Sequence, residues 1–197
     1  MTDGINEFVM EAKMTDGINE FVIDEKDISD ALDAAIRDGL VECFPHDVEY
    51  FSKQSWWHSR PQWRTLARND KGQIIGHIAV VIRDVLVGDE SLPLKVAGIQ
   101  SVFVCPKMQG TGLSNKIMKK TVQTASEQDI ATGFLHCAPK FEKTYRRMGW
   151  QKIDVNVLMQ DERGNTVPLP DKSIVMIYPL KRKDFPSGDV NLAGRDW

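Results

Sequence analysis

The sequence predicts a single mixed α/β domain, with one mostly antiparallel central sheet flanked by helices. Three observations carry this prediction: an amphipathic helical pattern near the start, two hairpin signals in succession, and strand and helix patterns that alternate in the second half. The chain of 197 residues suits one domain with a substantial core. This order of elements is typical of helices packed on one sheet.

The first 22 residues contain an internal duplication. Residues 1–9, MTDGINEFV, recur without change as residues 14–22. Two copies do not form a solenoid, which needs at least three units to bury a core. We therefore expect 1–22 to be a duplicated, flexible N-terminal segment and 23–197 to be the single folded domain.

The first predicted helix follows this segment. Asp27 or Ser29 can cap its start, and Gly39 is expected to end it. Its apolar positions recur at helical spacing: Ile28, Leu32, Ala35 and Ile36. Residues 42–64 then form an irregular stretch rich in aromatic side chains, with prolines that break regular structure.

The middle of the chain predicts an antiparallel meander. A short strand is expected over 63–67, a long one over 74–87 and a third over 94–104. The turn sequences NDKG at 69–72 and GDES at 88–91 separate these strands and indicate two hairpins.

The second half alternates between the two periodicities. An amphipathic helix is predicted over 113–125, a strand over 130–137 and a second helix over 140–148. Two strands, 152–159 and 174–179, close the domain. A strand that leads into a helix and then into another strand favours a mixed sheet.

Composition excludes several classes of protein. Hydrophobic residues make up 42% and charged residues 27%, and the net charge is −3. We expect no nucleic-acid partner, no membrane span and a cytoplasmic location. The three cysteines are isolated and form no CxxC pair, so we expect reduced thiols and no metal. Cys137 is the one passable candidate for a catalytic cysteine.

The sharpest local feature is the segment 102–114, VFVCPKMQGTGLS. A strand leads into a glycine turn, and the turn opens an amphipathic helix. Unpaired N–H groups and a partial positive charge make a helix start of this kind an anion site. No Walker lysine follows, and the third glycine of a dinucleotide fingerprint is missing.

This segment resembles the Q/R-x-x-G-x-G/A motif of GNAT acyltransferases, with Gln109, Gly112 and Ser114 at the motif positions. Ser114 departs from the usual glycine or alanine. Residues 141–150, FEKTYRRMGW, resemble a second family signature, Y-x-x-x-G-[FW]. The resemblance implies the GNAT fold and acetyl-CoA as the acyl donor.

The resemblance also implies roles for particular residues. The glycine turn would hold the pyrophosphate of CoA, and the preceding strand would pair with the pantetheine arm. The expected CoA-binding residues are Val102, Phe103, Val104, Gln109, Gly110, Thr111, Gly112, Leu113 and Ser114. Tyr145 would protonate the leaving thiolate, and the backbone N–H of Val104 or a neighbour would stabilise the oxyanion.

The general base is left open by the sequence. Gln100 stands where the aminoglycoside 2'-N-acetyltransferases, a GNAT group that this chain resembles, carry a glutamate. A glutamine can orient a water but cannot accept a proton. His77 titrates in a suitable range. It lies in a β-run, which also suits a structural histidine. Further candidates are exposed-loop groups: Glu42, His46, Asp47 and Glu49.

Two groups within the family resemble this chain more specifically. NodA-type acyltransferases share Ser55-Trp56, Arg60-Pro61, Arg64, Gly76-His77-Ile78, Pro106, Gly110 and Gly112. Aminoglycoside 2'-N-acetyltransferases share His77, the 145–150 segment, Asp171 and Trp197. The resemblance implies acetylation of a primary amine on a small acceptor, such as an aminoglycoside or aminosugar. The expected acceptor-binding residues are Glu42, Asp47, Trp56, Trp57, Asp171 and Trp197.

Two other functions remain open. One is transfer of a longer acyl chain, as in NodA-type enzymes, and the other is a non-catalytic CoA-binding module. Proteins of this family often dimerise, which allows a homodimer, although the sequence identifies no dimer surface.

Overall fold

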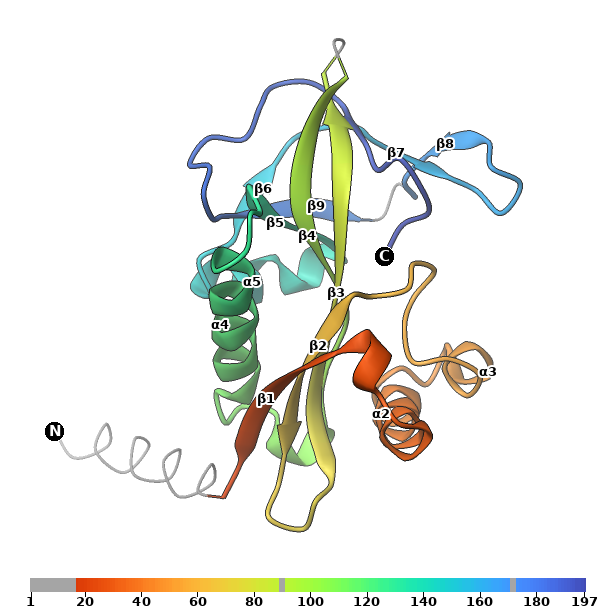
Figure 1. Ribbon diagram of the computed structural model, residues 1–197, viewed down its shortest axis with the longest axis vertical. Helices are drawn as coiled ribbons and strands as arrows, with labels where there is room; N and C mark the ends of the chain where they lie inside the picture. Colours follow the sequence, from red (N-terminus) through yellow and green to blue (C-terminus); the bar gives the residue numbers. More distant parts are fainter. Residues whose placement is uncertain (1–16, 89–90, 171–172) are drawn as a thin grey trace, which may run out of the picture.

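The computed structural model describes residues 17–88, 91–170 and 173–197, in which ten strands form one mixed sheet with helices on both faces (Figure 1). The strands are β1 Asn19–Asp24, β2 Trp63–Arg68, β3 Ile74–Val87, β4 Leu92–Val104, β5 Thr132–Cys137, β6 Gln151–Ile153, β7 Val157–Gln160, β8 Thr166–Pro168, β9 Ile174–Pro179 and β10 Val190–Asn191. The helices are α2 Asp30–Cys43, α3 Val48–Phe51, α4 Leu113–Ser126 and α5 Glu142–Arg147, with 3-10 turns η1 Glu25–Asp27, η2 Pro106–Met108 and η3 Pro139–Phe141. Among these helices, none is long and apolar enough to cross a membrane.

The sheet confirms the predicted mixed architecture. Its strand order is β6-β9-β5-β4-β3-β10-β7-β8, and β2 pairs with both β3 and β1. The β4–β5 and β10–β7 pairs are parallel, whereas the other strand pairs between described residues are antiparallel.

The pairing of β4 with β5 is short, and this creates a fork in the sheet. The two strands pair only from Val96 to Gly98 on β4, opposite Thr132 to Phe134 on β5. β4 continues to Val104 beside β3, with an irregularity where Ser101 takes a positive φ of 49°. The end of β4 is therefore left without β5 as a neighbour, and a cavity opens there.

Helices cover the two faces of the sheet separately. α4 and α5 lie on one face, while α2 and α3 lie on the other (Figure 1). The predicted stripe of α4 is confirmed, because its buried residues are Leu113, Ile117, Met118, Thr121 and Ala125. α2 buries Ile36 and Leu40 on the opposite face, against Phe103 of β4.

The start of α2 confirms one of the two predicted caps, but the predicted end was wrong. Ser29 is the N-cap, and its hydroxyl accepts a hydrogen bond from the N–H of Leu32 at 3.3 Å. Gly39 does not end the helix, which runs on to Cys43. A Cβ at residue 39 would overlap the ring of Phe103, so glycine there permits the close approach of α2 to β4.

The last third differs from the sequence pattern in two places. The single strand expected over 152–159 is two strands: β6 pairs with β9, and β7 pairs with β8 and β10. The helix expected over 140–148 is divided between η3 and the shorter α5. A change of partner strands separates β6 from β7, and local periodicity does not record such a change.

The second copy of the N-terminal duplication contributes to the sheet. Asn19–Asp24 form β1, which pairs with β2 from Asn19 opposite Arg68 to Asp24 opposite Trp63. The domain boundary predicted between residues 22 and 23 therefore falls inside this strand. The first copy, residues 1–9, lies outside the described residues.

Candidate active site

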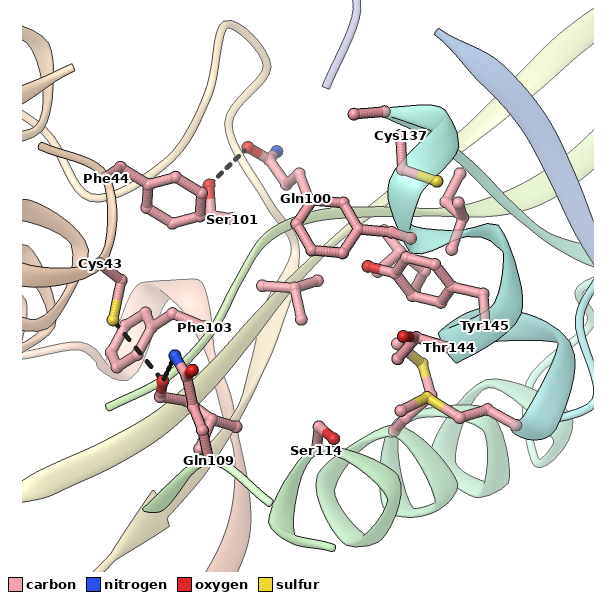
Figure 2. Close-up of a pocket in the computed structure, with 18 of the residues that line it drawn as sticks. Cys43, Phe44, Gln100, Ser101, Phe103, Gln109, Ser114, Cys137, Thr144 and Tyr145 are labelled. Atoms are coloured by element: carbon pink, nitrogen blue, oxygen red, sulfur yellow. Dashed lines mark hydrogen bonds between the residues drawn. The ribbon is translucent and has the colours of Figure 1, made fainter. Parts of the chain in front are cut away.

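A cavity of about 660 Å³ lies at the fork between β4 and β5. Figure 2 shows the end of β4, the start of α4 and the helix α5 around it. Its wall includes eight of the nine predicted CoA-binding residues: Val102, Phe103, Val104, Gln109, Gly110, Gly112, Leu113 and Ser114. Tyr145, Gln100, Asp47, Trp57 and Trp197 line the same cavity. The fold thus brings most of the predicted site together.

The glycine turn forms the N-terminal approach to α4. Gly110 and Gly112 have φ values of +79° and +78°, which L side chains rarely adopt. Gln109 donates from Nε2 to the carbonyl oxygen of Val104 at 3.2 Å, which ties the turn to β4. The N–H groups of Leu113 and Ser114, the first two residues of the 14-residue helix α4, have no partners inside the helix. They are therefore available to an anion in the cavity.

Thr111 is the one predicted CoA-binding residue that supports the turn from behind. Its side chain is buried, and Oγ1 donates to the carbonyl oxygen of Met108 at 2.7 Å. The threonine therefore stabilises the shape of the turn, and its neighbours form the cavity wall.

The edge of β4 that faces away from β3 has free backbone groups. The N–H of Cys105 donates to the carbonyl oxygen of Ile75 at 2.9 Å, so residue 104 belongs to the non-hydrogen-bonded positions of this ladder. The carbonyl oxygen of Val104 accordingly accepts from Gln109 and from Cys43 Sγ, at 3.7 Å for the latter. Because N–H and C=O of one strand residue point to the same edge, the Val104 N–H also faces the fork. An extended ligand could pair there as an added strand.

Tyr145 projects from α5 toward the cavity (Figure 2). Its ring packs edge-on against Trp150, with centroids 6.1 Å apart. Burial, and then the nearby Cys137, raise the pKa of the phenol. The hydroxyl therefore keeps its proton at neutral pH and can donate it.

Cys137 lies beside Tyr145 at the end of β5 (Figure 2). Burial and then the charge of Glu142 raise the pKa of its thiol to about 11. A thiol that stays protonated at neutral pH is a poor nucleophile, so the environment disfavours a catalytic cysteine here.

Gln100 holds an aromatic loop against the sheet. Its Nε2 donates to the carbonyl oxygen of Ser59 at 2.6 Å, and its Oε1 accepts from the N–H of Trp57 and from Ser101 Oγ, the latter at 3.3 Å. Because both the nitrogen and the oxygen of its amide are hydrogen-bonded, Gln100 is suited to a positioning role.

His77 is buried on β3, beside β4. Its Nδ1 donates to the carbonyl oxygen of Ser101 at 2.7 Å, and its ring stacks on Phe103 with centroids 5.5 Å apart. Burial, and then the positive charge of Arg64, lower the pKa of His77 to about 3. This placement favours a structural histidine that supports the irregularity of β4 at Ser101.

The predicted acceptor residues separate into two groups. Asp47, Trp57 and Trp197 line the cavity. Glu42 is exposed, and the ring of Trp56 faces the Arg60 and Arg64 guanidinium groups at 5.6 and 5.7 Å. Asp171 lies outside the described residues.

The exposed-loop candidates for the base lie near α3. His46 is exposed on the turn that precedes this helix, and exposed Glu49 accepts a hydrogen bond from Lys53 at 2.9 Å. Arg64, one of the residues shared with NodA-type enzymes, is fully buried, and its Nε donates to Glu25 at 2.8 Å.

The end of the sequence folds back onto the fork. Trp197 is 2% exposed and crosses Gly98, where a Cβ would overlap its indole. Its ring contacts Phe134 edge-on at 5.7 Å, and the guanidinium of Arg83 lies 5.3 Å from its centroid. Ser59 fixes the preceding residue, because its Oγ donates to the carbonyl oxygen of Asp196 at 2.7 Å.

His136 is a cavity residue that the sequence reasoning missed. Burial lowers the pKa of its imidazole, and its surroundings include Asp196, His58 and the backbone of Trp197. His136 occupies an apolar β-pattern, and its partners are far away in the chain. No local signal identifies it; the alternation of β5 would have shown only that it faces away from Cys137.

Comparison with known proteins defines the class. The model of the acetyltransferase (GNAT) domain family matches residues 25–153, and the chain belongs to this family of N-acetyltransferases. A search of curated proteins found no match. The mixed sheet with its flanking helices is the fold of this class.

Several solved structures share the fold at low sequence identity. A GNAT acetyltransferase from Staphylococcus aureus Mu50 has a TM-score of 0.53 at 17% identity, covering 82% of this chain and 99% of its own. The Escherichia coli N-acetyltransferase YhbS in complex with CoA has 0.55 at 18%, covering 89% and 90%. A GNAT acetyltransferase from Brucella melitensis in complex with acetyl-CoA has 0.54 at 19%, covering 87% and 94%.

Proposed function

We propose that this protein transfers the acetyl group of acetyl-CoA to a primary amine of a small acceptor. The observation that carries the proposal is that one cavity joins the glycine turn of α4, the free edge of β4 and Tyr145. The CoA and acetyl-CoA complexes of the Escherichia coli and Brucella proteins support the choice of donor.

The residues of the chain divide the work of binding the donor. Backbone N–H groups of residues 110–114 hold the pyrophosphate, where helix start and glycine turn favour an anion. Val102 and Val104 pair with the pantetheine arm along the free edge of β4. Acetyl-CoA supplies the acetyl group as a thioester, and the Val104 N–H stabilises the negative charge that develops on its carbonyl oxygen.

Tyr145 completes the donor side. Its phenol is held protonated and lines the cavity, so it can protonate the sulfur as the thiolate leaves. Gln100 and His77 act through position: Gln100 holds the aromatic loop, and His77 supports β4 at Ser101.

The acceptor side favours a cationic, partly apolar amine. Asp47 adds negative charge to the cavity wall, and Trp57 and Trp197 add aromatic surface on which a sugar face can stack. An aminoglycoside or aminosugar fits this chemistry, with Asp47, Trp57 and Trp197 as the acceptor-binding residues.

The test is release of free thiol from acetyl-CoA against a panel of aminoglycosides, polyamines and amino acids. We expect turnover with at least one amine, and Tyr145→Phe should lower kcat by roughly 10²–10⁴-fold while leaving acetyl-CoA affinity within about twofold. Tyr178→Phe is the matched control. Tyr178 also packs edge-on against Trp150, with ring centroids 5.6 Å apart, but it does not line the cavity, so this variant should retain full activity.

Two outcomes would redirect the proposal. Tight acetyl-CoA binding without turnover on any amine would indicate a non-catalytic CoA-binding module. Mass spectrometry of CoA species that co-purify with the protein would reveal a longer acyl chain, and turnover with that donor alone would indicate a NodA-type activity.

A further inference from the structure

His136 and Tyr145 approach the cavity from opposite faces of β5. Leu135 and Cys137 face the side of α4 and α5, where Tyr145 lies. Because side chains alternate along a strand, Phe134 and His136 face the other side, where Phe134 packs on Trp197. Tyr145, the proposed acid, and the His136 imidazole therefore lie on opposite faces of β5.

The imidazole of His136 has a buried nitrogen that makes no hydrogen bond to the described residues. Nε2 is buried and has no hydrogen-bond partner among the residues that the structure describes. The ring lies near the backbone of Trp197, and His136 lines the cavity. A buried polar nitrogen left unpaired is costly, so a partner supplied by a bound ligand is favoured at this position.

The carboxylate of Asp196 is near enough to His136 to influence its pKa. The side chain of Asp196 is 7% exposed, and one of its oxygens is hydrogen-bonded to Nδ1 of His58. Burial alone would raise the pKa of Asp196, but the His58 hydrogen bond and the charges of His58 and His136 together lower it. Asp196 therefore remains an anion that can stabilise a positive charge on His136.

We propose that His136 accepts the proton of the acceptor amine, and that Asp196, which His58 holds by a hydrogen bond, stabilises the imidazolium that results. This inference rests on the proposed acetyltransferase function and assigns its missing base. It places the acceptor amine on the Trp197 side of β5, across the strand from Tyr145.

The neutral amine nitrogen forms a bond to the acetyl carbonyl carbon and passes one proton to His136. The carbon–sulfur bond breaks, and the electron pair leaves with sulfur, which takes the proton of Tyr145. Transfer of the proton from His136 to the tyrosinate through solvent restores both residues. An acceptor that arrives as an ammonium ion first loses one further proton to solvent.

The charges around His136 keep it ready to accept a proton. Burial is the largest influence and lowers its pKa below the ordinary 6.5, and His58 acts in the same direction. Asp196 and the backbone of Trp197 act in the opposite direction without reversing the shift. The imidazole is therefore neutral at pH 7, as a base requires.

The first test compares His136→Asn with the wild type and with Gln151→Asn, a change at an exposed residue of β6 that serves as the control. We expect kcat to fall at least roughly 100-fold in His136→Asn, with acetyl-CoA affinity unchanged. The acid limb of kcat/KM against pH, with its midpoint below 6.5 in the wild type, should disappear. Folded His136→Asn that keeps kcat within about threefold and retains the acid limb would overturn the proposal.

The second test uses His58→Asn, which changes a residue with 25% side-chain exposure and so does not depend on repacking at β5. Removing His58 removes a charge that lowers the pKa of His136, so the acid limb should move to higher pH. An unchanged limb would contradict the assignment even if His136→Asn does not fold. Wild-type turnover that falls in Tyr145→Phe but not in His136→Asn would refute this inference alone, whereas no wild-type turnover on any amine would refute the proposed function as well.

Discussion

Gly110→Ala tests whether the glycine turn holds the pyrophosphate. Gly110 has a φ of +79° and a Cβ added there would meet no protein atom within 4 Å. Gly164, in the turn before β8, has a φ of +81° and equally open surroundings. Alanine at either position should therefore cost the same backbone strain, about 1–2 kcal/mol. The two substitutions differ in that only Gly110 borders the cavity.

The expected difference is in ligand affinity. Loss of one backbone hydrogen bond to a charged phosphate oxygen costs about 1.5–3 kcal/mol. Gly110→Ala should then bind acetyl-CoA about 10- to 150-fold more weakly, and Gly164→Ala should bind as the wild type does. Calorimetric titration gives the affinities, and urea denaturation gives the matched stability losses. Equal stability losses together with wild-type affinity in both variants would refute the assignment of the pyrophosphate to this turn.

Two further predictions concern stability. Glu25→Gln leaves Arg64, which is 0% exposed, without its anionic partner, so urea denaturation should show that the free energy of unfolding falls by about 3–5 kcal/mol. The control Asp24→Asn breaks the exposed pair with Lys26 and should lower the free energy of unfolding by less than about 1 kcal/mol. The folded pKa of His77, about 3, lies below its ordinary 6.5, so the unfolded chain binds the extra proton between these values and stability falls as pH falls from 6.5 toward 3. His77→Gln should remove up to about 1.4 kcal/mol per pH unit of that dependence, and an unaltered slope between pH 6.5 and 4.5 would contradict the burial of a neutral imidazole.

The sequence predicted the parts of the fold that local patterns encode. The β3 bounds match the pattern at both ends, and the stripe of α4 faces the sheet as its spacing indicated. Gly39 was read as a helix stop because glycine is common after helices. Glycine at this position instead permits a close contact with Phe103, which lies 64 residues away in the chain, and no local rule describes that contact.

The candidate site divides in the same way. The predicted donor half lies on one continuous segment, from β4 through the turn into α4, so motif and periodicity together could predict it. The acceptor half joins the loop after α3, the end of β5 and the last residues of the sequence. Its assembly depends on Ser59 holding Asp196 and on Trp197 crossing Gly98. These contacts arise from tertiary packing, and His136 therefore had no signal of its own.

One physical cause sets both protonation states that the proposed reaction needs. Burial penalises charge, so it raises the pKa of Tyr145 and lowers the pKa of His136. Tyr145 is thereby held as a neutral phenol that can donate its proton, and His136 is held as a neutral imidazole that can accept one. An acid and a base prepared in this way on opposite faces of one strand do not neutralise each other before the substrates arrive. The fork between β4 and β5 is the place where both faces open onto one cavity, and this makes it the point at which a proton can be taken from the amine and another given to sulfur.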